Sequence, residues 1–437
     1  MNDLAFLAYF PDPFDVKDSR YFLRSGTVDS HEVSGRDLSD FAGLLVTYEA
    51  QVLIDDMRRG GFHPPSRLVN IDDGIRLRVG RAKDDGGERL WDVWHNLISH
   101  FDSPQRAQLF EKVVRSKTHR PDVGEIATLL AQGAQALSGL WTDLQAALQH
   151  RGELARFLDV DVPVQQIFHH RQAKGIAVDK DSAMSLLRHV ANEKYLAYSK
   201  VADKLGRSPA GLGFWNIQQH LEKTDASDLA GEIDGGRLRE LFKIIAGRSE
   251  FAREYLSYSD ADRDETVLRR SAVPGGRLYP EFQAHGTVTG RILVSDPYLQ
   301  QLRRKYRKIV AADHGKRLAY LDYAQFEPGI LAFLSDDKGL INAYNEGDLY
   351  DALSIAVFGN ANSRPLSKRI FLAYSYGMTT DRIAKLLLGE NTGEDALALM
   401  EAKIKAFFFA FPGLETFRQS KQSELSENGF VSSLRQR

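Results

Sequence analysis

Residues 316–335, KRLAYLDYAQFEPGILAFLS, constrain this chain most, because they join two apolar runs through a carboxylate and a polar turn. The first run, residues 318–321, is long enough for a short buried strand. The strand would end at Asp322, and the pattern of residues 330–334 is helical again. A carboxylate in this position is a frequent ligand of Mg²⁺. It is equally typical of an Asp that only caps the next helix, and both interpretations stay open at this point.

A second segment, residues 364–378, places four side chains at intervals of four residues, so they share one face of a helix. These are Arg364, Lys368, Leu372 and Tyr376. Arg offers a two-pronged donor to phosphate and Lys a mobile charge. The face is therefore suited to a triphosphate, with the apolar and aromatic residues nearer a sugar and base. Because such spacing is common in amphipathic helices, the face gains significance only beside Asp322.

Composition bounds the remaining possibilities. A chain of 437 residues suggests two or three domains, and 43% apolar with 27% charged residues allows large cores. The absence of cysteine excludes disulfides, thiolate zinc sites and thiol catalysis. No segment approaches the roughly 18–20 apolar residues of a membrane span, and the N-terminus lacks the basic flank and cleavage site of a signal peptide. We therefore expect no membrane association.

The first 155 residues have the pattern of an α/β unit. The predicted elements are a strand at 41–46, a helix at 50–59, a second strand at 68–79 interrupted by a turn signal at 72–74, and a long helix at 122–150. From residue 159 the pattern changes to long amphipathic helices, with Asp179 placed to cap one that runs toward Leu205.

Basic residues gather between residues 277 and 308, where seven Lys or Arg stand against two Asp or Glu. In a chain with 57 basic and 59 acidic residues this is a local stripe, as expected of a surface that follows phosphates. A solvated, charged loop has the same composition, so the stripe alone does not distinguish a phosphate-binding surface from such a loop.

Together these segments resemble DNA polymerase family A, the bacterial polymerase-I-like and phage replicative enzymes. Residues 322–327 (DYAQFE) and 330–335 resemble the family's first palm motif. Arg364, Lys368, Tyr376 and Gly377 match its fingers helix, and residues 289–291 with 295–300 resemble its primer–template segment. The three motifs lie in family order, and the resemblance covers about residues 160–437.

The resemblance implies an α+β fold. A right-hand polymerase would occupy residues 156–437, with thumb about 175–275, partial palm about 276–345 and fingers about 346–437. An α/β RNase H-like, exonuclease-type domain would precede it at residues 1–155. The resemblance also implies a template-directed DNA polymerase in the cytoplasm of a bacterial or phage-infected cell, with primer–template DNA and dNTPs as partners and two Mg²⁺ ions as cofactors.

Roles at individual positions follow from the same resemblance. Asp322 would ligate both ions together with the Tyr323 carbonyl, and Lys368 would protonate the leaving pyrophosphate. The nucleotide contacts would be Arg364, Lys368, Leu372, Tyr376, Gln325, Glu327 and Tyr350, with Glu327 closing the space near the sugar 2′ position. The DNA contacts would be Thr289, Arg291, Gln300, Arg303, Arg304 and Arg307.

Three positions depart from the family pattern. Gly329 stands where Arg is usual, and Leu372 where the fingers helix usually has Phe or Tyr. The Leu puts family-like sugar discrimination in doubt and leaves a polymerase of RNA or template-switching type open, although Glu327 favours deoxynucleotides. Tyr350 stands where His is common; its hydroxyl can donate to phosphate but carries no cation.

The family's His-Asp-Glu motif, which supplies the second metal-binding Asp, is not found, and residues 429–437 resemble the hairpin that precedes it. Two metals need carboxylates from both sides. We therefore expect the N-terminal part of a split polymerase, completed by a second polypeptide. A truncated polymerase and a non-catalytic DNA-binding scaffold are the alternatives.

Proofreading chemistry needs an Asp-x-Glu at the end of the first strand and two further Asp, and no Asp-x-Glu lies near the N-terminus. Glu49 and the pair Asp72–Asp73 are either remnants or surface turn residues. The sequence therefore predicts a degenerate exonuclease-like domain without nuclease activity.

Overall fold

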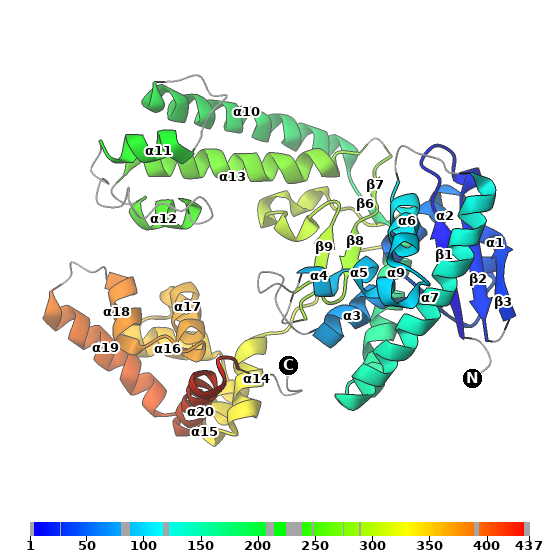
Figure 1. Cartoon of the computed structure of the whole chain (residues 1–437). Helices are drawn as coiled ribbons and strands as arrows, with labels where there is room; N and C mark the ends of the chain where they lie inside the picture. The colour runs from blue at the N-terminus through cyan, green and yellow to red at the C-terminus, as the bar shows by residue number, and fades with distance from the viewer. Residues whose placement is uncertain are drawn as a thin grey trace. The chain divides into compact units, whose positions relative to one another are not determined.

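The computed structural model describes residues 4–26, 28–79, 88–116, 122–206, 214–223, 238–246, 249–273, 275–287, 290–388 and 393–431 (Figure 1). The chain has two compact units, Met1–Leu318 and Ala319–Arg437. The first combines a five-stranded sheet with helices, and the second is helical, which confirms the predicted α+β class. The predicted domain boundary near residue 155 falls inside the first unit and stays a prediction.

The N-terminal sheet has the order β3-β2-β1-β4-β5. Its strands are β1 (Leu4–Phe10), β2 (Arg20–Ser25), β3 (Val28–Val33), β4 (Leu44–Thr47) and β5 (Leu68–Asn70). β2 is antiparallel to both of its neighbours, whereas β1, β4 and β5 are parallel. The three parallel strands therefore end at one edge of the sheet, which is where ligands bind in many open α/β sheets.

Helix α7 (Val123–His150) packs along β1, β2 and β3. Its Leu130, Leu137 and Leu144 are all buried, and their spacing of seven places them on one side of the helix. The other helices of this part are α1 (Gly35–Ser39), α2 (Ala50–Arg59), α3 (Ile71–Val79), α4 (Glu88–Trp91), α5 (Val93–Leu97), α6 (Pro104–Val114), α8 (Leu154–Arg156) and α9 (Val162–Lys174). The predicted helices at 50–59 and 122–150 are confirmed.

The strand predicted at residues 68–79 is wrong beyond Asn70, because α3 starts at Ile71. Ile71 and Ile75 are fully buried and four residues apart, so a helix places both side chains in the core. Asp72 and Asp73 lie in the first turn, where carboxylates interact favourably with the helix dipole. They are 8% and 2% exposed, so they are not surface turn residues.

Two long helices, α10 (Lys180–Leu205) and α13 (Glu250–Ser271), lie side by side, accompanied by α11 (Phe214–Leu221) and α12 (Leu238–Ile245) (Figure 1). Asp179 caps α10 as predicted, accepting from the Ser182 N–H at 3.0 Å. Strand β6 (Ile176–Ala177) precedes α10 and pairs with β7 (Arg277–Leu278), which follows α13. This pairing holds the start of α10 close to the end of α13. A further ribbon joins β8 (Glu281–Gln283) to β9 (Leu293–Ser295).

Gly175 ends α9 with φ +71°, and a Cβ there would lie 2.6 Å from the Leu278 carbonyl oxygen. We expect Gly175→Ala to destabilise the first unit by about 3 kcal/mol, since it adds a backbone clash to left-handed strain. Gly206→Ala is the matched control: φ is +63°, but nothing lies within 4 Å of its Cβ, so only about 1 kcal/mol should be lost. Urea unfolding followed by Trp fluorescence measures both. Equal losses would contradict the clash.

The second unit consists of α14 (Phe326–Ser335), α15 (Lys338–Glu346), α16 (Leu349–Phe358), α17 (Arg364–Ser375), α18 (Thr380–Leu388), α19 (Glu394–Phe409) and α20 (Pro412–Asn428). They pack around a common apolar core that includes Leu340, Leu353, Phe371, Ile404 and Leu414. The helices predicted after Asp322 and at residues 364–376 are thus confirmed as α14 and α17.

The strand predicted at residues 318–321 is wrong. No strand is formed there, and Leu318 and Leu321 are 58% and 91% exposed. A strand needs neighbours that satisfy its N–H and C=O groups, and within the described residues no backbone–backbone hydrogen bond involves residues 317–323. The apolar run alone does not provide them. No helix in the described part of the chain combines the length and apolar character needed to cross a bilayer.

Candidate functional site

Asp322 lies in the exposed segment that leads into α14. Its Oδ2 accepts a hydrogen bond from the Tyr320 hydroxyl at 3.1 Å. Tyr323 is 80% exposed, and its ring lies 5.3 Å from that of Phe326. The Asp322 carboxylate is therefore open to solvent and does not cap α14, so the interpretation of Asp322 as a helix cap is wrong.

Gln325 ties the start of α14 to the start of α16. It adopts φ +49°, its Oε1 accepts from the Leu349 N–H at 2.7 Å, and its Nε2 donates to the Gly347 carbonyl at 3.1 Å. A left-handed conformation at a non-glycine residue is uncommon and costs energy. The two hydrogen bonds hold it in place, so Gln325 fixes the position of Glu327, two residues later, relative to α16.

Glu327 and Tyr376 connect α14 to the end of α17. The Tyr376 hydroxyl donates to Glu327 Oε1 at 3.0 Å. Both residues line an apolar hollow of about 300 Å³, together with Leu372, Ile330, Leu331 and Phe371 among others. Three predicted nucleotide contacts, Glu327, Leu372 and Tyr376, are thus brought together around one hollow.

Arg364, at the first residue of α17, is held by carboxylates. Asp348 Oδ2 accepts from its Nη2 at 2.5 Å and from its Nε at 3.1 Å, and Asp351 Oδ1 lies 3.5 Å from the Nε. Burial opposes ionisation of Asp348, but hydrogen bonds from Arg364 and from the backbone at the start of α16 hold its pKa below the usual value. Sequence reasoning missed this partner, although Asp348 has the signature of a helix cap.

Tyr350 lies beside Arg364 and Lys368. It is only 3% exposed, and burial, followed by the nearby Glu327 charge, raises the pKa of its hydroxyl to about 12. The Arg364 guanidinium carbon and the Lys368 Nζ lie 5.2 Å and 5.8 Å from the centre of its ring. The predicted cationic pair therefore shares an aromatic neighbour.

Gly329 departs from the family pattern for a local reason. A Cβ at this position would lie 2.8 Å from the Tyr344 ring, whose hydroxyl is 3.5 Å from the Ala324 carbonyl. Tyr344 thus occupies the space that a side chain at residue 329 would need.

The predicted DNA contacts lie in the other compact unit. Thr289 lies outside the described residues, whereas Arg291, Arg304 and Arg307 are exposed. Arg303 forms ion pairs with Asp260 at 2.8 Å and Asp264 at 3.0 Å, so much of its charge is neutralised. The Gln300 side chain bonds to the backbone of Ile292 and Val294 and supports β9.

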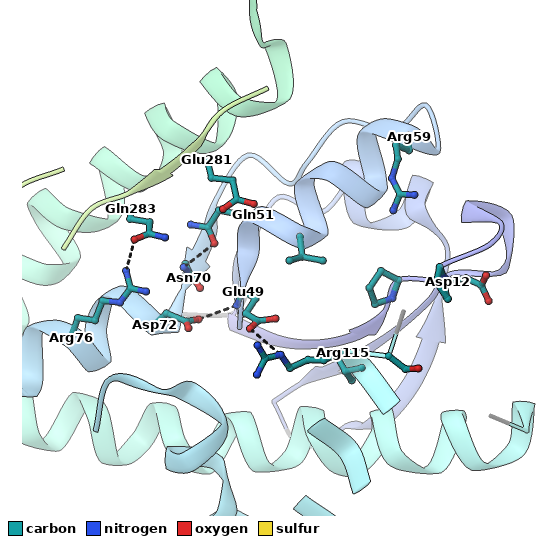
Figure 2. A pocket seen from close by; sticks show the side chains of 15 residues that line it. Asp12, Glu49, Gln51, Arg59, Asn70, Asp72, Arg76, Arg115, Glu281 and Gln283 are labelled. Atoms are coloured by element: carbon teal, nitrogen blue, oxygen red, sulfur yellow. Dashed lines mark hydrogen bonds and ion pairs between the residues drawn. The ribbon is translucent and has the colours of Figure 1, made fainter. Parts of the chain in front are cut away.

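A cavity of about 460 Å³ lies at the edge of the sheet where β1, β4 and β5 end (Figure 2). Asp72 accepts from the Glu49 N–H at 2.9 Å, and Glu49 Oε1 accepts from the Trp94 indole at 3.1 Å and lies 4.0 Å from Arg115. Burial, then the Asp72 charge, raises the pKa of Glu49. These carboxylates already have protein partners.

The described residues of this chain contain no cluster of three or more His, Asp or Glu side chains arranged to hold a metal. We therefore expect no Mg²⁺-dependent shortening of a labelled 3′ end, because Glu49 and Asp72, two of the four carboxylates that line the cavity, are hydrogen-bonded within the protein. The measurement is gel analysis of a 5′-labelled primer incubated with the purified chain. Shortening that disappears in a Glu49→Gln variant would contradict the prediction.

Comparison with known proteins assigns a protein family to the second unit and to the region that precedes it. The model of DNA polymerase family A matches residues 239–437. The chain belongs to this family. DNA polymerase I of Lactococcus lactis is 24% identical over 350 residues, 74% of this chain and 38% of that protein. The thermostable DNA polymerase I of Thermus caldophilus is 25% identical over 436 residues, 94% of this chain and 46% of that protein.

DNA polymerase I of Pseudomonas aeruginosa is 30% identical over 325 residues, 68% of this chain and 34% of that protein. The chain thus spans less than half the length of these relatives. Among solved structures, the polymerase domain of M. smegmatis Pol1, in complex with DNA primer-template and dNTP, superposes with a TM-score of 0.69. The superposition covers 99% of this chain and 77% of the Pol1 domain at 18% sequence identity, which confirms a shared polymerase fold.

Family A polymerases depend on divalent metal ions, and the site residues fit this requirement in part. The exposed Asp322 carboxylate suits one ligand position of an ion that also takes oxygens from water and substrate phosphates. Tyr323 follows it directly and offers a main-chain oxygen.

Proposed function

We propose that this chain provides the nucleotide-binding part of a template-directed DNA polymerase. The observation that carries the proposal is the arrangement around α17: Arg364 and Lys368 gather at one end, and Tyr376 meets Glu327 at the other. One helix face thus combines phosphate-binding cations with a hollow suited to a sugar and base. The likeness to a polymerase domain solved with DNA primer-template and dNTP supports the same function.

In this proposal the primer 3′-oxygen attacks the α-phosphorus of the dNTP in line, and the bond to pyrophosphate breaks. Lys368 gives its proton to the leaving pyrophosphate oxygen, while the proton of the 3′-hydroxyl passes to solvent. Arg364 holds the phosphates, and Glu327 occupies the space that a ribose 2′-hydroxyl would need. Arg291, Arg304 and Arg307 follow the primer–template backbone.

Asp322 and the Tyr323 carbonyl would hold the Mg²⁺ ions, which lower the barrier by stabilising charge on both the attacking and the leaving oxygen. We infer that a second carboxylate comes from another polypeptide, because the described residues contain no cluster of three or more His, Asp or Glu side chains that could hold a metal. The chain would then be one part of a split enzyme.

Primer extension tests the proposal. A labelled primer–template is incubated with Mg²⁺, four dNTPs and the 437-residue chain, alone or with the protein encoded directly downstream of it. Extension is expected only in the mixture. Extension by the chain alone would refute the need for a second carboxylate. DNA binding without extension in either reaction would show a scaffold instead.

A further inference from the structure

Tyr350 is a buried residue of the second unit. It lies in the first turn of α16 and contributes to the apolar core. Its ring meets that of Phe371 edge-on, with centroids 5.9 Å apart and planes at 79°. Edge-to-face packing of this kind is favourable. Because Tyr350 is only 3% exposed, the packing around it sets the position of its ring.

Two long, flexible cations converge on this fixed ring. Arg364 and Lys368 are one helical turn apart on α17, so their like charges repel. Both charged ends lie within the distance of about 6 Å at which an aromatic face attracts a cation. Asp348 holds Arg364 in addition, whereas no ion pair of Lys368 is found in the described chain. Lys368 therefore depends most on the ring.

We propose that Tyr350 is a positioning residue whose ring, rather than its hydroxyl, holds Arg364 and Lys368 together as one triphosphate-binding face. The inference rests on the proposed function, because it names how that site organises its cations. It replaces the expectation that the Tyr350 hydroxyl donates to a phosphate. Pre-organised side chains lose less conformational entropy when the ligand arrives, which strengthens binding.

A role of the Tyr350 ring and a role of its hydroxyl predict different triphosphate affinities for one variant. Tyr350→Phe keeps the ring and removes the hydroxyl, so it should bind the triphosphate within about 2-fold of the unaltered chain. Tyr350→Leu removes the ring and should weaken binding about 5- to 30-fold, the equivalent of two cation–π contacts. Tyr350→Met places an unbranched, flexible side chain of similar volume to Leu in the vacated core without an aromatic face, and should behave like Tyr350→Leu.

The measurement is a titration of the whole 437-residue chain with fluorescent dATP and Mg²⁺, with inorganic tripolyphosphate as competitor. Tripolyphosphate has no sugar or base, so an equal fold-change for both probes locates the loss at the phosphates. Tyr374→Leu is the matched control. Like Tyr350 this tyrosine is buried, but it lies on α17, stacks on Phe408 with ring centroids 3.7 Å apart and lies under Arg418. It should lower thermal stability without changing tripolyphosphate affinity.

Three results would overturn the inference. One is equal weakening by Tyr350→Phe and Tyr350→Leu, which would show a hydroxyl contact. Another is unchanged binding in Tyr350→Leu and Tyr350→Met. The third is absence of dATP binding by the unaltered chain, which would also sink the proposed function. If no primer extension were observed but Tyr350→Phe still bound the triphosphate more tightly than Tyr350→Leu, only the catalytic proposal would be refuted.

Discussion

Replacing Asp322 by alanine is expected to abolish primer extension by the complemented enzyme, with a loss of at least about 1000-fold, or about 4 kcal/mol in the barrier. The Asp322 carboxylate is exposed, and its hydrogen-bond partner Tyr320 is exposed as well. Removing it should therefore leave the fold and DNA affinity unchanged. Single-turnover extension measures the rate, and gel shift with the same primer–template measures binding.

Asp395→Ala is the matched control, because Asp395 is also an exposed carboxylate of the second unit, in the first turn of α19. It should extend the primer at the unaltered rate. If Asp322→Ala retained more than about a tenth of the activity, the assignment of Asp322 as a metal ligand would be wrong.

Replacing Asp337 by alanine is expected to destabilise the second unit by about 3–5 kcal/mol. The side chain is 4% exposed and serves two helices. Its Oδ1 accepts from Leu340 N–H at 2.9 Å in α15, and its Oδ2 accepts from Gly413 and Leu414 N–H at 2.6 Å and 3.1 Å in α20. Alanine would leave three donors without this partner in a buried place, where each lost hydrogen bond is costly.

Two probes separate the units in this measurement. All four Trp residues belong to the first unit, so Trp fluorescence follows that unit alone, whereas far-UV circular dichroism follows both. The dichroism transition of the second unit should shift to lower urea while the fluorescence transition stays in place. Asp179→Ala is the control, an exposed cap of a single helix worth about 1 kcal/mol. An equally small effect at Asp337 would contradict the double cap.

Much of the site could be predicted from the sequence because it depends on local rules. The spacing of Arg364, Lys368, Leu372 and Tyr376 follows from the period of a helix; α17 contains the first three of these residues, and Tyr376 is its C-cap. Asp179 ahead of a helical pattern predicts its cap, since that bond joins residues three apart. Family membership followed from motifs in order, which need no tertiary structure.

Contacts between distant residues were decided only by the tertiary structure. The run at residues 318–321 has the composition of a strand, but a strand exists only where other segments satisfy its backbone. Asp72 and Asp73 have the signature of a turn, but they lie in helix α3, which buries Ile71 and Ile75 in the core. Tyr350 was expected to act through its hydroxyl, whereas in the structure its ring packs against Phe371 and lies close to two cations. Periodicity and capping act over one or two turns and are written in the sequence, whereas burial and charge pairing depend on which distant segments the fold brings together.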